Sequence, residues 1–160
     1  MEDSFRYLLK NAMNSKEFKN LFGEEAKINN FKKGPGGWYK ESNECIAVLE
    51  LQKSNYGDYY MLLMKIFIQG AFDQRYEPNK ELMKRSIGHV TGNETEEFRP
   101  LFDFDQSMED EERKVGLKKV FKDLIVPFTD STLSIAGIKT LVERGEVHGT
   151  PAVKEELMKF

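Results

Sequence analysis

The chain has 160 residues, the length of one domain. Its composition, with 39% hydrophobic, 12% aromatic and 32% charged residues, excludes a disordered tail. Lys and Arg total 24 against 27 Asp and Glu, so the net charge of −3 gives no overall attraction for a phosphate backbone. We therefore expect a single folded domain over residues 1–160, and we do not expect nucleic acid as a partner.

The chain shows no sign of export or membrane insertion. The opening segment MEDSFRYLLK begins with acids and lacks a basic region followed by an apolar run. The longest apolar stretch, Tyr59–Ile68, is too short to span a bilayer and is interrupted by Lys65. The single cysteine, Cys45, cannot form an intramolecular disulfide and lies in an apolar run typical of a buried thiol. The sequence predicts a cytoplasmic protein without membrane contact.

Two helices are expected before the first strand. In the first, apolar residues recur at the spacing of one helical face: Phe5, Leu8, Leu9, Ala12 and Met13. A second, short helix carries Phe18, Leu21 and Phe22, and Gly23 can end it in the left-handed conformation.

A sheet is predicted from Phe31 onward, where glycine, proline and β-prone residues follow one another. The first four strands are expected at Phe31–Lys33, Gly37–Glu41, Cys45–Lys53 and Tyr59–Gln69. Their short connections force antiparallel neighbours. Residues 70–93 are predicted to be a long connection with one helical turn, and a further strand is expected at Arg99–Asp103.

The C-terminal part is predicted to be helical. Ser107 is expected to cap a helix that buries Leu117, Val120, Phe121, Leu124 and Ile125. Pro127 is expected to end that helix, because proline removes a backbone donor. A next helix, capped by Asp130 or Ser131, is predicted to bury Ile135, Ile138, Leu141 and Val142 and to end at Gly145. Thr150 and Pro151 start a short terminal helix.

Helices followed by strands and then helices are typical of an α+β fold. The sequence therefore predicts an antiparallel β-meander of about five strands, covered by an N-terminal helix and by C-terminal helices. We expect the helix of Phe121 to pack on the sheet face of Leu62, Met64 and Ile66, because both surfaces are continuously apolar.

No catalytic residue, cofactor or metal site is predicted. The two histidines, His89 and His148, lie far apart without a flanking ligand pattern. The segment from Asp103 resembles a calcium-binding loop, but Met108 and Lys114 occupy the positions that need glycine and glutamate. Neither phosphate-binding glycine motif is present, and no nucleophile has a base and an orienting group at recognisable spacing.

Two charged regions could contact a partner. Basic residues alternate with aromatic ones from Lys27 to Lys40, a pattern that can bind single strands, although the acid excess elsewhere argues against this. Nine acidic residues lie between Glu94 and Glu112, and Arg99 alone opposes them up to Glu112. This acidic region could bind a basic partner or form a plain solvated surface.

The predicted binding surface lies at the polar end of the third and fourth strands. Glu50 and Gln52 emerge from otherwise apolar strands, so they must be solvated or held for recognition. The structural alternative is that Lys53 is solvated and Gln52 fastens the adjoining hairpin. The full set of candidate binding residues is Trp38, Tyr39, Glu50, Gln52, Lys53, Lys65, His89 and Arg99.

The chain resembles the bacterial family called domain of unknown function 4304. The resemblance is carried by Gly37-Trp38-Tyr39-Lys40, by Ile46–Gly57 with its Gln-Lys-Ser, and by Tyr59-Tyr60-Met61-Leu62. It departs from the family at Met61–Ile66, where a sequence closer to Ile-Asn-Leu-Gly is usual, so no role for an asparagine carries over. The family has no assigned activity, so the resemblance supports the fold and leaves the function open.

Two classes of function remain. A small non-catalytic protein-binding or adaptor domain, for example an immunity-like neutraliser of a toxin, is favoured by the absence of catalytic motifs. The alternative is a small enzyme with a polar pocket near the sheet end, formed by Glu50, Gln52, Lys65, His89 and Arg99. The oligomeric state stays open.

Overall fold

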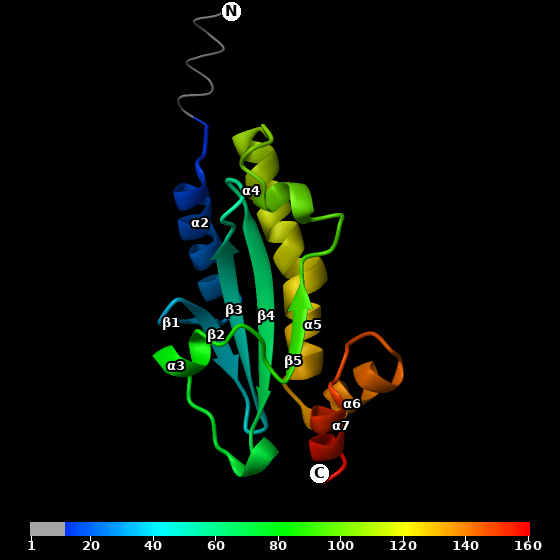
Figure 1. The fold of residues 1–160 in the computed structure, drawn as a ribbon. Coiled ribbons are helices and arrows are strands. Elements are labelled where there is room, and N and C mark those ends of the chain that lie inside the picture. Colours follow the sequence, from blue (N-terminus) through cyan, green and yellow to red (C-terminus); the bar gives the residue numbers. More distant parts are fainter. Residues whose placement is uncertain (1–11) are drawn as a thin grey trace, which may run out of the picture.

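A five-stranded antiparallel meander, in which each strand pairs with the next one along the chain, forms the centre of the computed structural model (Figure 1). The structure describes residues 12–160, so most of the predicted helix at Phe5–Met13 lies outside the described residues. The strands are β1 (Lys32–Gly34), β2 (Gly37–Glu41), β3 (Cys45–Lys53), β4 (Tyr60–Ile68) and β5 (Val90–Asn93). The predicted α+β fold is confirmed.

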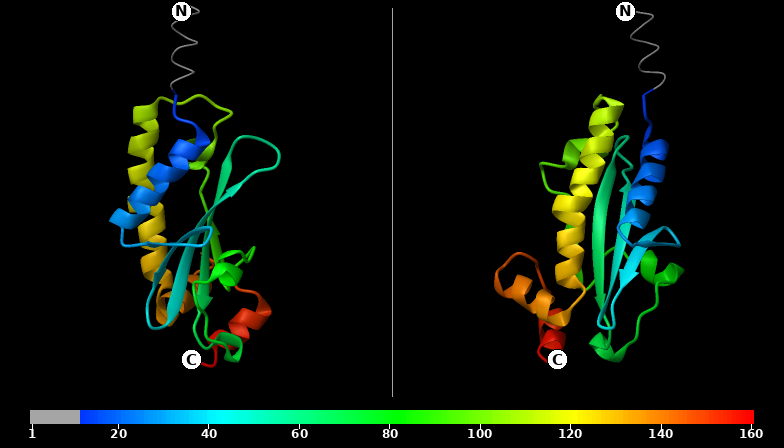
Figure 2. Two further views of the ribbon diagram at one scale, coloured as in Figure 1. Left: turned by 90° about the vertical axis from the view of Figure 1, so that its left-hand side faces the viewer. Right: turned by 180° about the vertical axis from the view of Figure 1, so that it is seen from behind.

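One face of the sheet is covered by α2 (Ser15–Ile28) and by the long helical rod that starts with α4 (Asp110–Val120) (Figure 2). Phe121 packs in one buried cluster with Leu62 and Met64, as predicted. Ile66 instead belongs to a second cluster on the same face, together with Ile138 of α6 (Ile135–Glu143). Helices from both chain ends therefore bury this face along its whole length.

The helix α2 runs past Gly23, so the prediction that this glycine ends it is wrong. The helix ends at Ile28 with Asn29 as its C-cap, and Asn30 adopts the left-handed conformation with φ of 70°. Gly23 instead faces Trp38, and a Cβ at Gly23 would lie 3.1 Å from the indole Nε1. A larger residue at this position would press on the ring, so glycine allows the helix and the indole to pack closely.

The prediction that Pro127 ends its helix is also wrong. The rod continues from α4 through the π-helical turn η3 (Phe121–Ile125) into α5 (Val126–Thr132). A proline inside a helix clashes with the carbonyl four residues earlier. The N–H of Val126 bonds to the carbonyl of Phe121, five residues back, and this wider turn accommodates the proline.

The helix caps differ in part from the predicted ones. The helix α4 follows Glu109, without a side-chain cap, rather than Ser107. Ser134, instead of Asp130 or Ser131, caps α6 by accepting a hydrogen bond from the Gly137 N–H at 3.0 Å.

Two predicted helix boundaries are confirmed. Gly145 follows the end of α6 with a φ of 70°, a conformation that side chains with a Cβ rarely adopt. Thr150 caps α7 (Pro151–Leu157), where its hydroxyl accepts from the Val153 N–H at 3.2 Å.

The fifth strand lies in the segment that was predicted to be a connection. β5 pairs with β4 through Val90 opposite Ile66 and Asn93 opposite Leu63. The segment predicted as a strand, Arg99–Asp103, instead contains the 3₁₀ helix η2 (Arg99–Phe102). Buried Arg113 of α4 fixes this segment by donating to the carbonyls of Leu101 (2.7 Å) and Asp103 (3.2 Å).

The second face of the sheet is covered near the middle and at one end. The helix α3 (Lys80–Met83) and the loop after the 3₁₀ turn η1 (Ala71–Asp73) pack over it (Figure 1). The residues buried there are Ile46, Val48, Phe67, Tyr76, Leu82 and Met83. Within residues 12–160, no helix has the length and apolar character needed to cross a bilayer.

Candidate functional site

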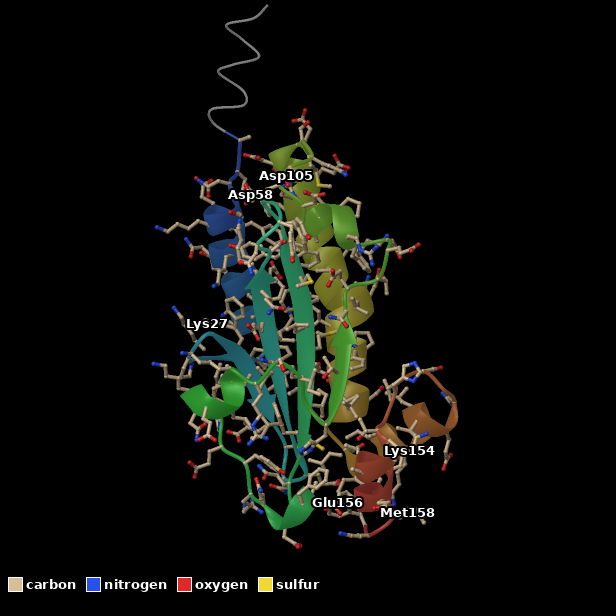
Figure 3. The ribbon with its side chains drawn as sticks, viewed as in Figure 1. Lys27, Asp58, Asp105, Lys154, Glu156 and Met158 are labelled. Carbon is tan, nitrogen blue, oxygen red and sulfur yellow. The ribbon has the colours of Figure 1, made fainter. Side chains whose placement is uncertain are left out.

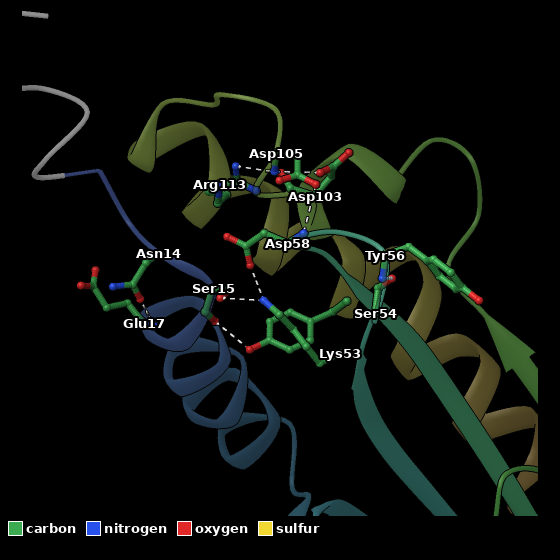
Figure 4. Close-up of polar contacts among 11 residues, drawn as sticks. Asn14, Ser15, Glu17, Lys53, Ser54, Tyr56, Asp58, Asp103, Asp105 and Arg113 are labelled. Carbon is green, nitrogen blue, oxygen red and sulfur yellow. Dashed lines mark hydrogen bonds and ion pairs between the residues drawn. The ribbon is translucent and has the colours of Figure 1, made fainter. Parts of the chain in front are cut away.

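Lys53 is tied to the hairpin between β3 and β4 and to the start of α2 (Figure 4). Its ammonium forms an ion pair with Asp58 and donates to the Ser15 hydroxyl at 3.1 Å. The Tyr60 hydroxyl donates to the Ser15 carbonyl at 3.1 Å, and Lys53 Nζ lies 5.1 Å from the Tyr60 ring. This lysine therefore holds the hairpin against the helix and is not simply solvated.

The hairpin itself is fastened by Ser54 and by the segment before α4. The Ser54 hydroxyl accepts from the Tyr56 N–H at 3.0 Å, and Asp105 accepts from the Asp58 N–H at 3.0 Å (Figure 4). Gln52, which was expected to fasten it, is exposed and its side chain makes no hydrogen bond within the described part of the chain. The Gln-Lys-Ser stretch thus contributes structure mainly through Lys53 and Ser54.

Glu50 and Lys65 come together on the second face of the sheet. Glu50 Oε1 accepts from Lys65 Nζ at 2.6 Å, and the same ammonium donates to the carbonyls of Met83 (2.7 Å) and Arg85 (2.8 Å). The lysine side chain is 0% exposed. All three of its donors are used, so Lys65 anchors the chain after α3 and has no free donor for a ligand.

The eight predicted binding residues do not form one site. Trp38 is opposite Leu49 on the helix-covered face, whereas Tyr39 is opposite Val48 on the second face. Strand alternation places Glu50 and Gln52 with Tyr39. Arg99 lies exposed in η2, and no hydrogen bond or ion pair within residues 12–160 joins it to Lys65 or His89.

A groove of about 790 Å³ lies between α2 and the hairpin of β1 and β2. Lys19, Gly23 and Lys27 follow at four-residue spacing, so they share one stripe of α2 that faces the groove. Lys33 stands opposite Trp38 in the strand pair and lines the other wall. We call this site the lysine groove; its charged lining residues are Lys19, Glu24, Lys27, Lys32 and Lys33.

The lysine groove carries uncompensated positive charge. Within residues 12–160, its four lysines make no ion pair, and Glu24 is the single acid of the lining. The neighbouring acid Glu25 is neutralised by Lys118 of α4 at 2.8 Å. Lys27 lies well away from Asp58 and Asp105, which mark the end of the molecule where α4 begins (Figure 3). The groove lysines thus lie apart from these two aspartates, although the net charge of the chain is negative.

Trp38 forms the apolar back wall of the lysine groove. Its ring packs on Phe22 with ring centroids 5.0 Å apart, and the side chain is buried. It is the single tryptophan of the sequence. Its emission therefore reports directly on events in the groove.

A second hollow of about 570 Å³, the His89 pocket, lies near the opposite end of the molecule from Asp58. His89 Nδ1 accepts a hydrogen bond from the Ile68 N–H at 2.9 Å. Burial, with the nearby Arg85 charge, lowers the pKa of His89 to about 4. The ring is therefore neutral at pH 7 and keeps its proton on Nε2.

Several residues that line the two hollows were not predicted as site residues, among them Lys19, Gly23, Phe72, Tyr76 and Arg85. The helical spacing of Lys19, Gly23 and Lys27 could have revealed the α2 stripe. The prediction that the helix ends at Gly23 left Lys27 outside the helix, so the stripe was missed. Arg85 and Tyr76 lie in irregular chain, where periodicity says nothing about side-chain direction.

Within residues 12–160, no group of three or more His, Cys, Asp or Glu side chains is arranged to hold a metal ion. Residues 22–131 match the family described as Domain of unknown function (DUF4304), so the chain belongs to this family. No curated protein and no solved structure matches the chain. The matched residues include the sheet and most of the lysine groove, whereas α6 and α7 lie beyond them.

Proposed function

We propose that this protein is a non-catalytic binding module that receives an acidic segment of a partner protein in the lysine groove. The observation that carries the proposal is the set of four lysines without ion-pair partners, within residues 12–160, around a groove backed by Trp38. Positive walls attract a negative ligand and speed its association. An immunity-like neutraliser is one form of this function, and we expect it to act in the bacterial cytoplasm.

A protein segment fits the lysine groove better than a nucleic acid does. Binding of single strands relies on aromatic faces that are open for stacking. Trp38 and Phe31, the aromatic residues of the groove, are buried at 6% and 3% exposure, and Phe31 is covered by Lys40 Nζ at 4.4 Å. The groove therefore offers charge and an apolar wall without a stacking platform.

The proposal is tested by titrating the protein with a short polyglutamate peptide while recording Trp38 emission. We expect a saturable change, absent with polyglutamine of the same length and weaker at high salt because screening shortens electrostatic range to a few Å at about 1 M. The double variant Lys27→Glu/Lys33→Glu should weaken binding about tenfold or more, because two favourable charge contacts become repulsive.

The matched control is Lys114→Glu/Lys122→Glu, which makes the same change in net charge at exposed positions outside the groove. If this control weakens binding as much as the groove variant does, the peptide responds to net charge and the proposal is wrong. A single-stranded oligonucleotide that binds more tightly than polyglutamate would also contradict it. Salt-sensitive self-association of the protein alone, abolished by the groove variant, would identify a second copy as the occupant instead.

A further inference from the structure

We propose that the His89 pocket, independently of the lysine groove, binds a small organic anion: a carboxylate carried on a planar apolar group. The pocket's volume of about 570 Å³ lies within the range of small-ligand sites. Its walls come from β4, from both ends of the 70–89 segment and from α7. Figure 3 shows Glu156 of α7 at this end of the molecule.

The floor of the pocket is aromatic. His89 lies 5.6 Å from the Phe67 ring centroid and 5.0 Å from that of Tyr76. The Arg85 guanidinium carbon lies 5.8 Å from the centroids of the same two rings. The imidazole and the guanidinium therefore lie against the same pair of rings, and both residues line the pocket.

Two donors for an anion remain free within the described residues. His89 Nδ1 is occupied by the Ile68 N–H, which leaves Nε2–H as the donor of the neutral ring. Nε2 has no hydrogen-bond partner within the described residues, and no described side-chain polar atom is both buried and unpaired, so Nε2 is accessible to solvent on a residue that lines the pocket. Arg85 makes no ion pair within residues 12–160. One cation beside one neutral donor suits a carboxylate monoanion better than a doubly charged phosphate.

Phe72, an aromatic residue with a strained backbone, forms another side of the pocket. Phe72 has a φ of 58° and Asp73 a φ of 56°, so two consecutive residues with side chains adopt the left-handed conformation. Glu156 accepts a hydrogen bond from the Phe72 N–H, and Lys159 pairs with the same carboxylate. The Phe72 ring nevertheless stays 41% exposed, 5.4 Å from His89.

Because Phe72 is this exposed, its burial does not offset the strain of its left-handed backbone conformation. A bulky residue in this conformation persists when its surroundings impose it, and such residues gather at ligand sites. The surrounding loop is tightly closed, since Gln69 and Tyr76 exchange two hydrogen bonds (2.7 and 2.9 Å) and the Tyr76 hydroxyl donates to Ala71 at 2.9 Å. The loop thus holds Phe72 as one side of the pocket.

The probe for this site is benzoate, measured by calorimetry and by NMR shifts of the His89 ring and the Ile68 amide. We expect saturable binding at one site, with benzamide and cyclohexanecarboxylate each binding about tenfold more weakly, because the first lacks the charge and the second the flat ring. Arg85→Gln should weaken benzoate binding about tenfold to a hundredfold, whereas Arg75→Gln, exposed and outside the pocket lining, should leave it unchanged.

Phe72→Gly separates binding from folding, because glycine accepts the left-handed conformation without strain. We expect a thermal midpoint equal to or above that of the wild type together with benzoate binding weakened about three- to tenfold. A lowered midpoint with unchanged benzoate affinity would show that Phe72 is structural and would overturn its role. Equal binding of benzoate and benzamide, or shifts that avoid His89 and Ile68, would overturn the site itself.

Discussion

Lys65 Nζ lies 2.6 Å from Glu50 Oε1, and the two side chains come from neighbouring strands on the sheet face away from α2. Because the lysine also donates to the carbonyls of Met83 and Arg85, one buried ammonium joins the sheet to the segment that carries the His89 pocket. The interaction links the middle of the sheet to the position of Arg85. Stability and pocket geometry should therefore depend on the same residue.

Lys65→Met should lower the free energy of unfolding by about 3–5 kcal/mol, because it removes one partner of a buried pair and orphans two carbonyls. Urea denaturation measures the change. Lys53→Met is the control, since its pair with Asp58 is about half exposed and should contribute less than about 1 kcal/mol. Equal losses for the two variants would contradict the structural role of Lys65.

Phe121→Ala should lower the free energy of unfolding by about 3–5 kcal/mol, because the ring is 1% exposed and its removal leaves a cavity among Phe22, Phe31 and the sheet. Val115→Ala on α4, where the side chain is 61% exposed, should change it by no more than about 0.5 kcal/mol. Chemical denaturation of both variants checks the contrast, and a small effect at Phe121 would place it outside the core.

Stability should fall as the pH is lowered from 7 toward 4, in part because of His89. Its pKa is 6.5 in the unfolded chain and about 4 in the fold, so the unfolded state binds the proton more tightly in this window. Burial is the main cause; Arg85 also lowers the pKa, and Glu156 opposes the shift. We expect a loss of about 1–2 kcal/mol, since partial exposure of the ring screens the effect.

Urea denaturation at several pH values measures this loss, and His89→Gln should flatten the dependence between pH 4 and 6.5. His148→Gln, at an exposed position, is the matched control and should keep the wild-type slope. Asp58, whose pKa is lowered chiefly by its hydrogen bond with Lys53, adds its own loss below this window. An unchanged slope in His89→Gln would show that the imidazole can be protonated in the fold.

The thiol of Cys45 should resist modification in the native protein. Burial, with a smaller contribution from the Glu44 charge, raises its pKa to about 12, and the side chain is fully buried. The reactive thiolate is therefore scarce and shielded. An aromatic disulfide reagent at mildly alkaline pH should detect one thiol in guanidinium and essentially none in buffer. Rapid labelling of the native protein would show that the strand end opens readily.

The sequence predicted the elements that have a strong local pattern. β2 and β3 have the predicted boundaries, and β4 differs by one residue at each end, because alternation and short turns define a half-buried strand locally. Proline and glycine marked some helix boundaries correctly, at Gly145 and Pro151, and others wrongly. Gly23 lies inside a helix, where it packs against Trp38. Pro127 also lies inside a helical segment, where the π-helical turn before it accommodates the ring.

The structure separates the residues that the sequence grouped as candidate binding residues. Trp38 was identified as a binding residue, and the structure places it in the lysine groove, but Glu50 and Lys65 are committed to each other and Arg99 lies apart. The face on which a side chain stands follows from strand alternation, whereas its partner comes from segments far away in the sequence. A polar residue in an apolar strand therefore indicates that a charge is buried there. The sequence does not show which groups form hydrogen bonds or an ion pair with that charge.

The amino-acid sequence by itself determined the α+β class, the first four strands in order and the apolar stripe of the Phe121 helix, because each depends on residues close together in the chain. The tertiary structure alone decided that Val90–Asn93 is a strand, since those four residues become one by pairing with β4. It also decided both hollows, because the groove lysines and the rings around His89 are joined across distant segments by packing and hydrogen bonds that no local pattern specifies.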